Sequence, residues 1–307
     1  MKRCLLTIGG LDVLGGGGIG TDMKTMEHYG FFSLSVISLV AGIEQGEFVF
    51  HEMDIATFEM QLATIAQNFQ NRLVGIKIGL LANPMQIKAV YQFCQPFIGK
   101  IPIVIDPVLA FKETAQQANQ DYLAALQPLL AIATILTPNL PEACLLLDEK
   151  IPDDLASVQN MAQRLQARFQ CAIYLKVGAR LSGNQAVDFL ALDDVVHVLQ
   201  APKIKQATIN GAGCCLSSAL CGALAQNHSL LGASQEAKKY VYQVPFKMDF
   251  LSQRKVAMFG TANKRKLGEE NESKKISTIG DDDSFDRRLI NDGDYSNTCD
   301  KRNCDIV

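Results

Sequence analysis

The sequence predicts an α/β protein with a mostly parallel central sheet and helices on both faces. Three observations support this fold class. Short apolar runs rich in Val, Ile and Leu alternate with longer amphipathic stretches, as in strand–helix–strand units. The strand candidates are apolar at nearly every position, as expected when both faces of a sheet are covered. Glycine, proline and polar residues gather directly after these runs, where the carboxyl ends of parallel strands place ligands.

The elements can be assigned in order from their periodicity. A short apolar run bounded by turn residues is typical of a buried strand, and apolar residues three and four apart are typical of a helix. We expect strands at residues 4–8, 31–42, 74–81, 102–109, 133–138, 171–178 and 186–192. We expect helices at residues 18–29, 55–68, 84–97, 119–131, 153–169 and 230–243.

The chain divides into a body and a tail. Residues 1–244 carry the alternating pattern and are numerous enough to bury a sizeable core as one domain. Residues 245–307 have mixed charge, with Ser, Gly and Asn and no sustained apolar period, a composition typical of disorder. We therefore expect a divergent, disordered C-terminal tail without a catalytic role, although short apolar segments within 244–260 could pack on the body.

Composition disfavours several classes of protein. The 307 residues are 48% hydrophobic with a formal net charge of -3, and no basic stripe favours nucleic acid. No apolar run reaches the roughly 18 to 20 residues that a membrane helix needs. The opening segment becomes glycine-rich too early for a signal peptide. We therefore expect a cytoplasmic protein with neither a membrane nor a nucleic-acid partner.

The nine cysteines predict reduced thiols. Their number is odd, which argues against a disulfide framework. A zinc site would need Cys-x-x-Cys pairs or a Cys/His cluster, whereas Cys214 and Cys215 are adjacent and the four histidines are scattered. Five others lie inside apolar stretches, where a thiol acts as a small core side chain; these are Cys4, Cys94, Cys144, Cys171 and Cys221.

The glycine cluster after the first strand offers an alternative function. Gly15, Gly17 and Gly20 have the GxGxxG spacing of dinucleotide-binding proteins, and Glu44 stands where a ribose-binding acid would follow. In that fingerprint the glycines follow the strand directly, whereas LDVL separates them from the predicted strand here. A nicotinamide-dependent oxidoreductase is therefore the less favoured interpretation.

The segment NGAGCC at residues 210–215 predicts an anion-binding turn. Gly211, Ala212 and Gly213 precede a helical stretch that opens with Cys214, so backbone N–H groups and the helix dipole would favour one anionic group. The same position would lower the pKa of the Cys214 thiol from about 8.5 toward neutrality, which would let it accept a proton from a substrate hydroxyl. The alternative is close helix packing in which the cysteines only fill space.

Polar residues at other strand ends point to the same chemistry. Asp106 follows one strand, Asn139 and Glu142 follow another in TPNLPEA, and Lys176 closes CAIYLK. Oxygen ligands at strand ends suit Mg²⁺ beside nucleotide phosphates. The alternatives are a turn-capping role for Asp106 and a helix-capping role for Glu142. A phosphate or nucleotide partner would explain the charge of Lys176.

In their order along the chain, the motifs GGLD, GGGG, KT, KIGLL, DPV, TPNLPEA, LKVG and GAGC resemble those of the ribokinase-like vitamin kinases. The similar branch contains the hydroxymethylpyrimidine/phosphomethylpyrimidine kinases and the pyridoxal kinases, and the resemblance runs from residue 3 to about residue 243. It implies a ribokinase-like fold, a homodimer, and transfer of the γ-phosphoryl group of ATP, with Mg²⁺, to a hydroxymethyl group on a small aromatic heterocycle.

The resemblance also implies roles for individual residues. Cys214 matches the cysteine that stands where sugar-kinase relatives carry a catalytic aspartate. The anion hole for the transferring phosphoryl group would be Gly211, Ala212 and Gly213. The metal ligands would be Asp106 and Glu142, and the nucleotide would contact Lys176 and Asn139. The wall around the substrate ring would be Gly17, Ile43, Leu80 and Val108, with Lys112 on the loop that follows.

One departure from the family pattern bears on the substrate. Pyrimidine-specific members place a glutamine at the position of Ile43, where it hydrogen-bonds the ring. A buried apolar side chain cannot replace that bond, and an unpaired polar group costs roughly 1–3 kcal/mol. This favours pyridoxal, pyridoxine or pyridoxamine, with the pyrimidine of thiamine synthesis as the alternative. Further departures, at Asn210 and Val177, keep a non-catalytic vitamin-binding relative open as a second alternative.

Overall fold

The computed structural model describes most of the predicted body and two short segments beyond it. The described ranges are 3–45, 47–109, 116–152, 154–178, 184–203, 209–243, 246–248 and 255–257. Lys112 is the one candidate site residue that lies outside them.

The central feature is one sheet that contains nine strands among the described residues. Its strands are Cys4–Asp12 (β1), Phe32–Glu44 (β2), Glu47–Glu52 (β3), Leu73–Ile78 (β4), Ile103–Ile105 (β5), Ile135–Leu136 (β6), Ala172–Gly178 (β7), Gln185–Leu192 (β8) and Val195–Pro202 (β9). Their order is β3-β2-β1-β4-β5-β6-β7-β8-β9. The strands from β2 to β7 in this order run parallel, whereas β3, β8 and β9 pair antiparallel at the two edges.

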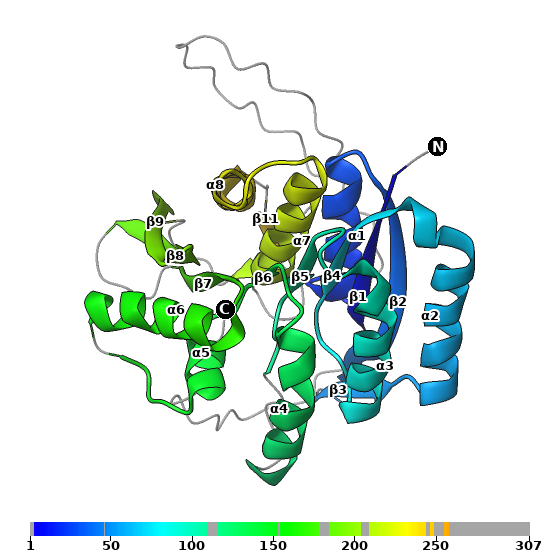
Figure 1. Ribbon diagram of the computed structural model, residues 1–307. Coiled ribbons are helices and arrows are strands. Elements are labelled where there is room, and N and C mark those ends of the chain that lie inside the picture. Colours follow the sequence, from blue (N-terminus) through cyan, green and yellow to red (C-terminus); the bar gives the residue numbers. More distant parts are fainter. Residues whose placement is uncertain are drawn as a thin grey trace, which may run out of the picture. The chain divides into compact units, whose positions relative to one another are not determined.

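Helices cover both faces of this sheet (Figure 1). Their bounds are Gly18–His28 (α1), Ile55–Phe69 (α2), Pro84–Cys94 (α3), Gln116–Leu130 (α4), Leu140–Leu147 (α5), Leu155–Phe169 (α6), Ala212–Ala225 (α7) and Leu230–Gln243 (α8). One apolar cluster joins α1, α7 and α8 to the sheet, and the other joins α2 to α6 to its opposite face. The predicted α/β fold class is confirmed. Within the described ranges, no helix combines the length and apolarity needed to cross a membrane.

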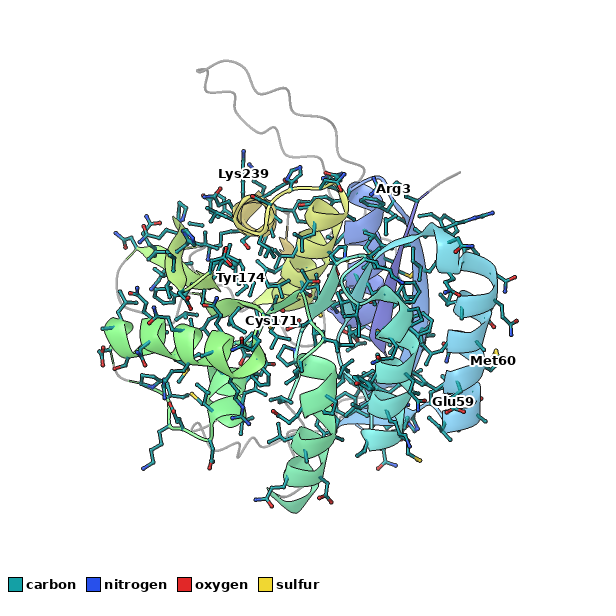
Figure 2. All side chains as sticks on the ribbon, in the orientation of Figure 1. Arg3, Glu59, Met60, Cys171, Tyr174 and Lys239 are labelled. Carbon is teal, nitrogen blue, oxygen red and sulfur yellow. The ribbon has the colours of Figure 1, made fainter. Side chains whose placement is uncertain are left out.

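The alternation of side chains along the strands explains why the strands are apolar throughout. On β1, Leu5 packs in the cluster with α1, α7 and α8, while Leu6 and Ile8 pack in the opposite one, because successive side chains of a strand point to opposite faces. Figure 2 shows the same contrast between the inside and the outside of the body: Tyr174 on β7 is fully buried, whereas Met60 on the outer side of α2 is exposed.

The strands β3 and β9 were not predicted. β9 pairs with β8 from Leu192 opposite Val195, and Asp193 and Asp194 between them both have positive φ, at 49° and 63°. Two consecutive left-handed residues are the geometry of a tight two-residue hairpin. The signal was an Asp-Asp pair, which is weaker than the Asn-Gly or Asp-Gly pairs that usually mark such turns.

Two segments of the expected tail form strands. Phe246–Met248 (β11) and Lys255–Ala257 (β12) pair antiparallel, and β12 pairs with Ile209–Asn210 (β10) directly before the NGAGCC turn. Both segments lie within the 244–260 region that contains the short apolar runs. The remaining residues of 245–307 lie outside the described ranges, so the disordered tail stays a prediction there.

Candidate active site

The predicted anion-binding turn forms the start of α7. Gly211 caps this helix with φ 80°, in the left-handed region, and its carbonyl accepts the first helical bond from the Cys215 N–H at 2.8 Å. A methyl group at residue 211 would lie 2.2 Å from the carbonyl oxygen of Gly16. Only glycine fits here, because both the backbone conformation and the close approach exclude a side chain.

The glycine loop before α1 packs against this turn. Asp12 holds the loop, since its carboxylate accepts hydrogen bonds from the N–H groups of Leu14, Gly16 and Gly17 at 2.9, 2.9 and 3.1 Å. A methyl group at Gly17 would lie 3.9 Å from the Cys214 sulfur. β1 extends to Asp12, so the gap between the strand and the glycines is shorter than predicted and contains only Val13 and Leu14. The nicotinamide interpretation still loses support, because Asp12 occupies N–H groups that a dinucleotide would need.

Cys214 lies in the first turn of α7 and is partly buried. Burial raises the pKa of its thiol to about 11. The Lys77 ammonium and a hydrogen bond from the Gly18 backbone act in the opposite direction, while Asp22 and Asp106 raise the pKa further. The expectation of a lowered pKa is therefore wrong, because desolvation of the sulfur outweighs the favourable position at a helix N-terminus.

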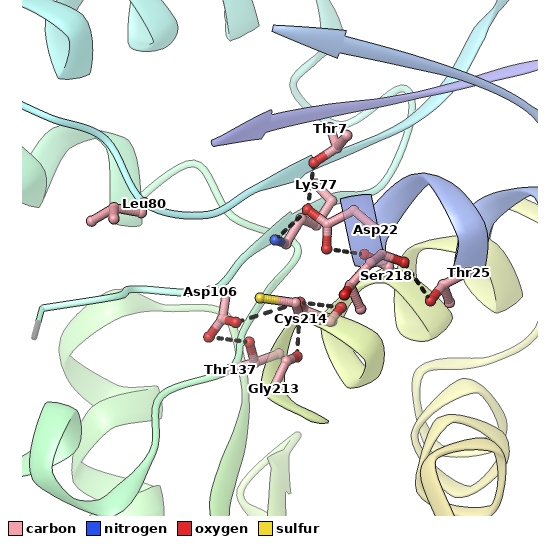
Figure 3. Close-up of polar contacts among 12 residues, drawn as sticks. Thr7, Asp22, Thr25, Lys77, Leu80, Asp106, Thr137, Gly213, Cys214 and Ser218 are labelled. Atoms are coloured by element: carbon pink, nitrogen blue, oxygen red, sulfur yellow. Dashed lines mark hydrogen bonds and ion pairs between the residues drawn. The ribbon is translucent and has the colours of Figure 1, made fainter. Parts of the chain in front are cut away.

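Asp106 and Lys176 meet beside this turn, as Figure 3 shows for Asp106. The Lys176 Nζ lies 2.6 Å from Asp106 Oδ1, which also accepts a hydrogen bond from the Thr137 hydroxyl at 3.2 Å. A methyl group at Gly213 would lie 3.3 Å from the lysine nitrogen and 3.7 Å from Asp106 Oδ2. Burial alone would lower the pKa of Lys176, but the carboxylates of Asp106 and Glu142 raise it overall. A cation thus stands beside the turn that was predicted to bind an anion.

Asn139 and Glu142 form a capping box at the start of α5. The Asn139 side chain accepts the Glu142 N–H at 2.9 Å, and the Glu142 carboxylate accepts the Asn139 N–H at 2.7 Å. Burial raises the pKa of Glu142 to about 7, although the nearby Lys176 lowers it. The helix-capping role is therefore present. Among the described residues, no group of three or more His, Cys, Asp or Glu side chains could hold a metal ion.

The predicted substrate wall is only partly gathered around this group. Gly17 faces Cys214, and Val108 lies two residues beyond Asp106, whose carbonyl accepts its N–H at 2.8 Å. Leu80 lies on the loop after β4, apart from the polar cluster (Figure 3). Ile43 lies near the end of β2 and is 42% exposed, so the expectation that it is buried is wrong.

A buried polar network beneath Cys214 escaped the sequence analysis. The Lys77 Nζ lies 2.7 Å from Asp22 Oδ2, which also accepts the Thr7 hydroxyl at 2.6 Å, and Asp22 Oδ1 accepts the Ser218 hydroxyl at 2.7 Å. Two signals could have revealed it. Lys77 is the one charged residue in the apolar run VGIKIGLL, and Asp22 stands four residues before the buried Met26 on α1.

A surface hollow of about 590 Å³ lies elsewhere in the protein. Its lining residues belong to the C-terminal ends of α1 and α7 and to α8; they are His28, Tyr29, Gln226, Gln235, Glu236, Lys239, Tyr240 and Gln243. Because the 14 residues of α7 span about 20 Å, this hollow is distant from Cys214 and does not belong to the same site.

Known proteins resemble this chain in sequence and in structure. Residues 12–250 match the family described as phosphomethylpyrimidine kinase. The hydroxymethylpyrimidine/phosphomethylpyrimidine kinase of Haemophilus influenzae is 34% identical over 244 residues, which cover 77% of this chain and 88% of that protein. The pyridoxine kinase of Bacillus subtilis is 29% identical over 243 residues, with 77% and 88% covered. The structure of an ADP complex of Bacillus subtilis pyridoxal kinase has a TM-score of 0.74 at 26% identity, covering 80% of this chain and 92% of that chain.

Proposed function

The chain belongs to the phosphomethylpyrimidine kinase family, and from this premise we propose that it transfers the γ-phosphoryl group of ATP to the 5′-hydroxymethyl group of pyridoxal, pyridoxine or pyridoxamine. The relatives support a vitamin kinase in the broader sense, because they include kinases named for both the pyrimidine and pyridoxine. The observation that carries the reaction class is the meeting of Cys214, the 211–213 turn and the Asp106–Lys176 pair at one edge of the sheet.

The turn and the lysine supply the charge stabilisation that phosphoryl transfer needs. The first N–H groups of a helix have no partner within the helix and can bind an anion, and those at Gly211, Ala212 and Gly213 begin α7. Lys176 adds a positive charge beside Gly213. Fixed N–H groups and a cation aimed at the transferring group account for much of the catalysis in such reactions.

Cys214 is the proposed proton acceptor. As the substrate oxygen forms its bond to the γ-phosphorus, the bond from that phosphorus to the ADP oxygen breaks, and the hydroxyl proton passes to the Cys214 sulfur. With a pKa of about 11, the resting thiol is mostly protonated at neutral pH. The reactive minority is a thiolate, which is a stronger base than an ordinary cysteine thiolate.

The family resemblance implies Mg²⁺, and the donor chemistry fits it. Asp106 and Glu142 offer hard carboxylate oxygens, and Mg²⁺ is commonly held by one or two carboxylates together with substrate phosphates. Within the part of the chain that the structure describes, the Asp106 Oδ2 atom has only a long contact of 3.5 Å with the Ser217 hydroxyl, which leaves it capacity for a ligand. When bound, the ion would neutralise charge on the phosphates. The nucleotide role that we assign to Asn139 rests on the resemblance alone.

The choice of a vitamin B6 substrate rests on Ile43, which cannot supply the ring hydrogen bond of the pyrimidine-specific members. Its exposed position near the end of β2 leaves it accessible to a ligand. The wall would also contain Gly17, Leu80 and Val108, with Lys112 on the following loop.

Product formation with each vitamin tests this proposal. Purified protein, ATP and Mg²⁺ are incubated with pyridoxal, pyridoxine, pyridoxamine or hydroxymethylpyrimidine, and phosphorylated products are measured by mass spectrometry. We expect turnover of the B6 vitamins and a shift toward the pyrimidine in the Ile43→Gln variant. Turnover of the pyrimidine with none of pyridoxal would overturn the substrate assignment.

The second candidate function is hydroxymethylpyrimidine/phosphomethylpyrimidine kinase, which the 34% identity to the Haemophilus influenzae enzyme favours. The same assay separates the two. Binding of a vitamin without any turnover would instead support a non-catalytic relative. The resemblance further leads us to expect a cytoplasmic homodimer. Light scattering would measure the mass of the particle in solution.

A further inference from the structure

The ion pair between Lys77 and Asp22 is fully buried, with side chains 2% and 1% exposed. Asp22 accepts three hydrogen bonds, from Lys77, Thr7 and Ser218, at 2.7, 2.6 and 2.7 Å. Burial alone would lower the pKa of Lys77, but Asp22 raises it overall, so the lysine stays charged. A methyl group at Gly79 would lie 2.8 Å from the Lys77 nitrogen, which places the ammonium at the carboxyl end of β4.

This pair lies on the side of α7 that carries Cys214. Ser218, which donates to Asp22, follows Cys214 by four residues on this helix, and residues four apart share one helix face. Figure 3 shows that Asp22 and Lys77 lie next to Cys214, and both charges act on its thiol. A hydrogen bond from the Gly18 backbone, at the start of α1, also reaches the Cys214 thiol.

The charges that surround the thiol come from four elements. Lys77 favours the thiolate more than any other of these charges, and Asp22 and Asp106 oppose it. The facing groups are Asp22 on α1, Lys77 on β4, Asp106 after β5 and Lys176 on β7.

A buried ion pair needs an explanation beyond stability, because apolar residues of similar size often stabilise a core as well or better. We propose that Lys77 and Asp22 are positioning residues for Cys214: the Lys77 ammonium, held in place by Asp22, stabilises the thiolate that accepts the substrate proton. This inference rests on the proposed function for the role of that proton, but the effect on the thiol exists without substrate.

The sign of the effect separates this role from a structural one. Removing the cation should make the thiolate rarer, whereas removing the opposing carboxylate should make it more common. A pair that served only to stabilise the fold would change the thiol in the same direction in both variants, because either substitution breaks the same contact.

The test is the rate at which iodoacetamide alkylates Cys214 at a fixed pH of about 8, followed by mass spectrometry of its peptide. At a pH well below the pKa of a thiol, raising that pKa by about 1 lowers the thiolate fraction about tenfold. We expect alkylation about tenfold slower in Lys77→Met and faster than wild type in Asp22→Asn. Changes of the same sign in both variants, or no change in either, would overturn the proposal.

Two further variants guard against loss of the fold. The doubly neutral Asp22→Asn/Lys77→Met variant removes both charges together, so its rate should lie between those of the single variants. Lys238→Met breaks another, partly buried pair, with Asp188 at 2.5 Å, and should leave Cys214 alkylation within about twofold of wild type. An equal slowing in Lys238→Met would also overturn the proposal.

The alkylation assay and the turnover assay test the two proposals separately. If the two single variants shift alkylation in opposite directions but no vitamin is phosphorylated, the proposed function is wrong and the electrostatic role stands. If the wild type phosphorylates a vitamin but alkylation is insensitive to Lys77, the positioning role alone is wrong. Circular dichroism of each variant confirms that the compared proteins are folded.

Discussion

Two lysine–aspartate pairs flank Cys214, and they differ in surroundings rather than in length. The nitrogen–oxygen distance is 2.7 Å for Lys77–Asp22 and 2.6 Å for Lys176–Asp106. The first lysine is 2% exposed and the second is 16% exposed. We call Lys77–Asp22 the sealed pair, because both side chains are buried, and Lys176–Asp106 the accessible pair, because its lysine is partly exposed.

The hydrogen bonds of the two carboxylates differ in length and distribution. Asp22 receives three bonds of 2.6 to 2.7 Å shared between its two oxygens. Asp106 receives bonds from Lys176 and Thr137 on Oδ1 and, among the described residues, only the 3.5 Å contact from Ser217 on Oδ2. The sealed pair is closed to a ligand, whereas the accessible pair is the one that we propose exchanges its contacts for those of a phosphate. The exposure of the lysine, and not the identity of the residues, therefore distinguishes the two pairs.

The strongest test of this contrast is loss of the sealed cation. Lys77→Met leaves Asp22 buried without its counter-ion, and removing one partner of such a pair costs about 3–5 kcal/mol. We expect the free energy of unfolding, measured by urea denaturation, to fall by about that amount. A loss below about 1 kcal/mol would contradict the view that the Lys77–Asp22 pair is the more enclosed of the two.

The matched change at the accessible pair should act on catalysis. Lys176→Met removes the cation that we propose faces the transferring phosphoryl group, and loss of one such group typically lowers turnover about 10²- to 10³-fold. Steady-state kinetics measures this effect. The unfolding free energy should fall by less than in Lys77→Met, and the reverse order of the two stability losses would contradict the comparison.

The dependence of turnover on pH tests the thiol that stands between the pairs. Because the pKa of Cys214 is raised to about 11 and the deprotonated form is the proposed base, the reactive fraction increases with pH through the neutral and mildly alkaline range. We expect turnover to rise by about tenfold per pH unit from about pH 7 to 9. A rate already constant across this range would mean that Cys214 does not titrate as described.

The smallest expected difference concerns the hydroxyl groups that support each carboxylate. Ser218→Ala removes a 2.7 Å bond to the sealed Asp22, and Thr137→Val removes a 3.2 Å bond to Asp106. Hydrogen bonds to buried charged groups contribute about 1.5–3 kcal/mol. Because the bond to Asp22 is the shorter one, thermal unfolding should show a larger loss for Ser218→Ala, and equal or reversed losses would contradict this ranking.

The sequence analysis identified both residues of the accessible pair but neither residue of the sealed pair. Asp106 and Lys176 could be found because they end apolar strands, and parallel strands bring their carboxyl ends to one edge. Gly211 could be found because a glycine before a helix marks a turn. In each case a local pattern carried the information.

Lys77 and Asp22 are 55 residues apart in the chain, and only the packing of α1 and α7 on β4 brings them together beneath Cys214. The raised pKa of Cys214 was missed for a related reason, because it depends on how deeply the sulfur is buried. The start of a helix can be predicted from neighbouring residues in the sequence. The desolvation of a side chain and the charges that reach it from separate elements cannot.

The most direct test of the central claim is product formation by wild type and Cys214→Ala with pyridoxal and MgATP, measured by mass spectrometry. General base catalysis typically contributes 10²- to 10⁴-fold, so we predict that pyridoxal 5′-phosphate forms at least about a hundredfold more slowly in the variant while pyridoxal still binds. Equal rates in the two proteins, or no product from either, would contradict the account.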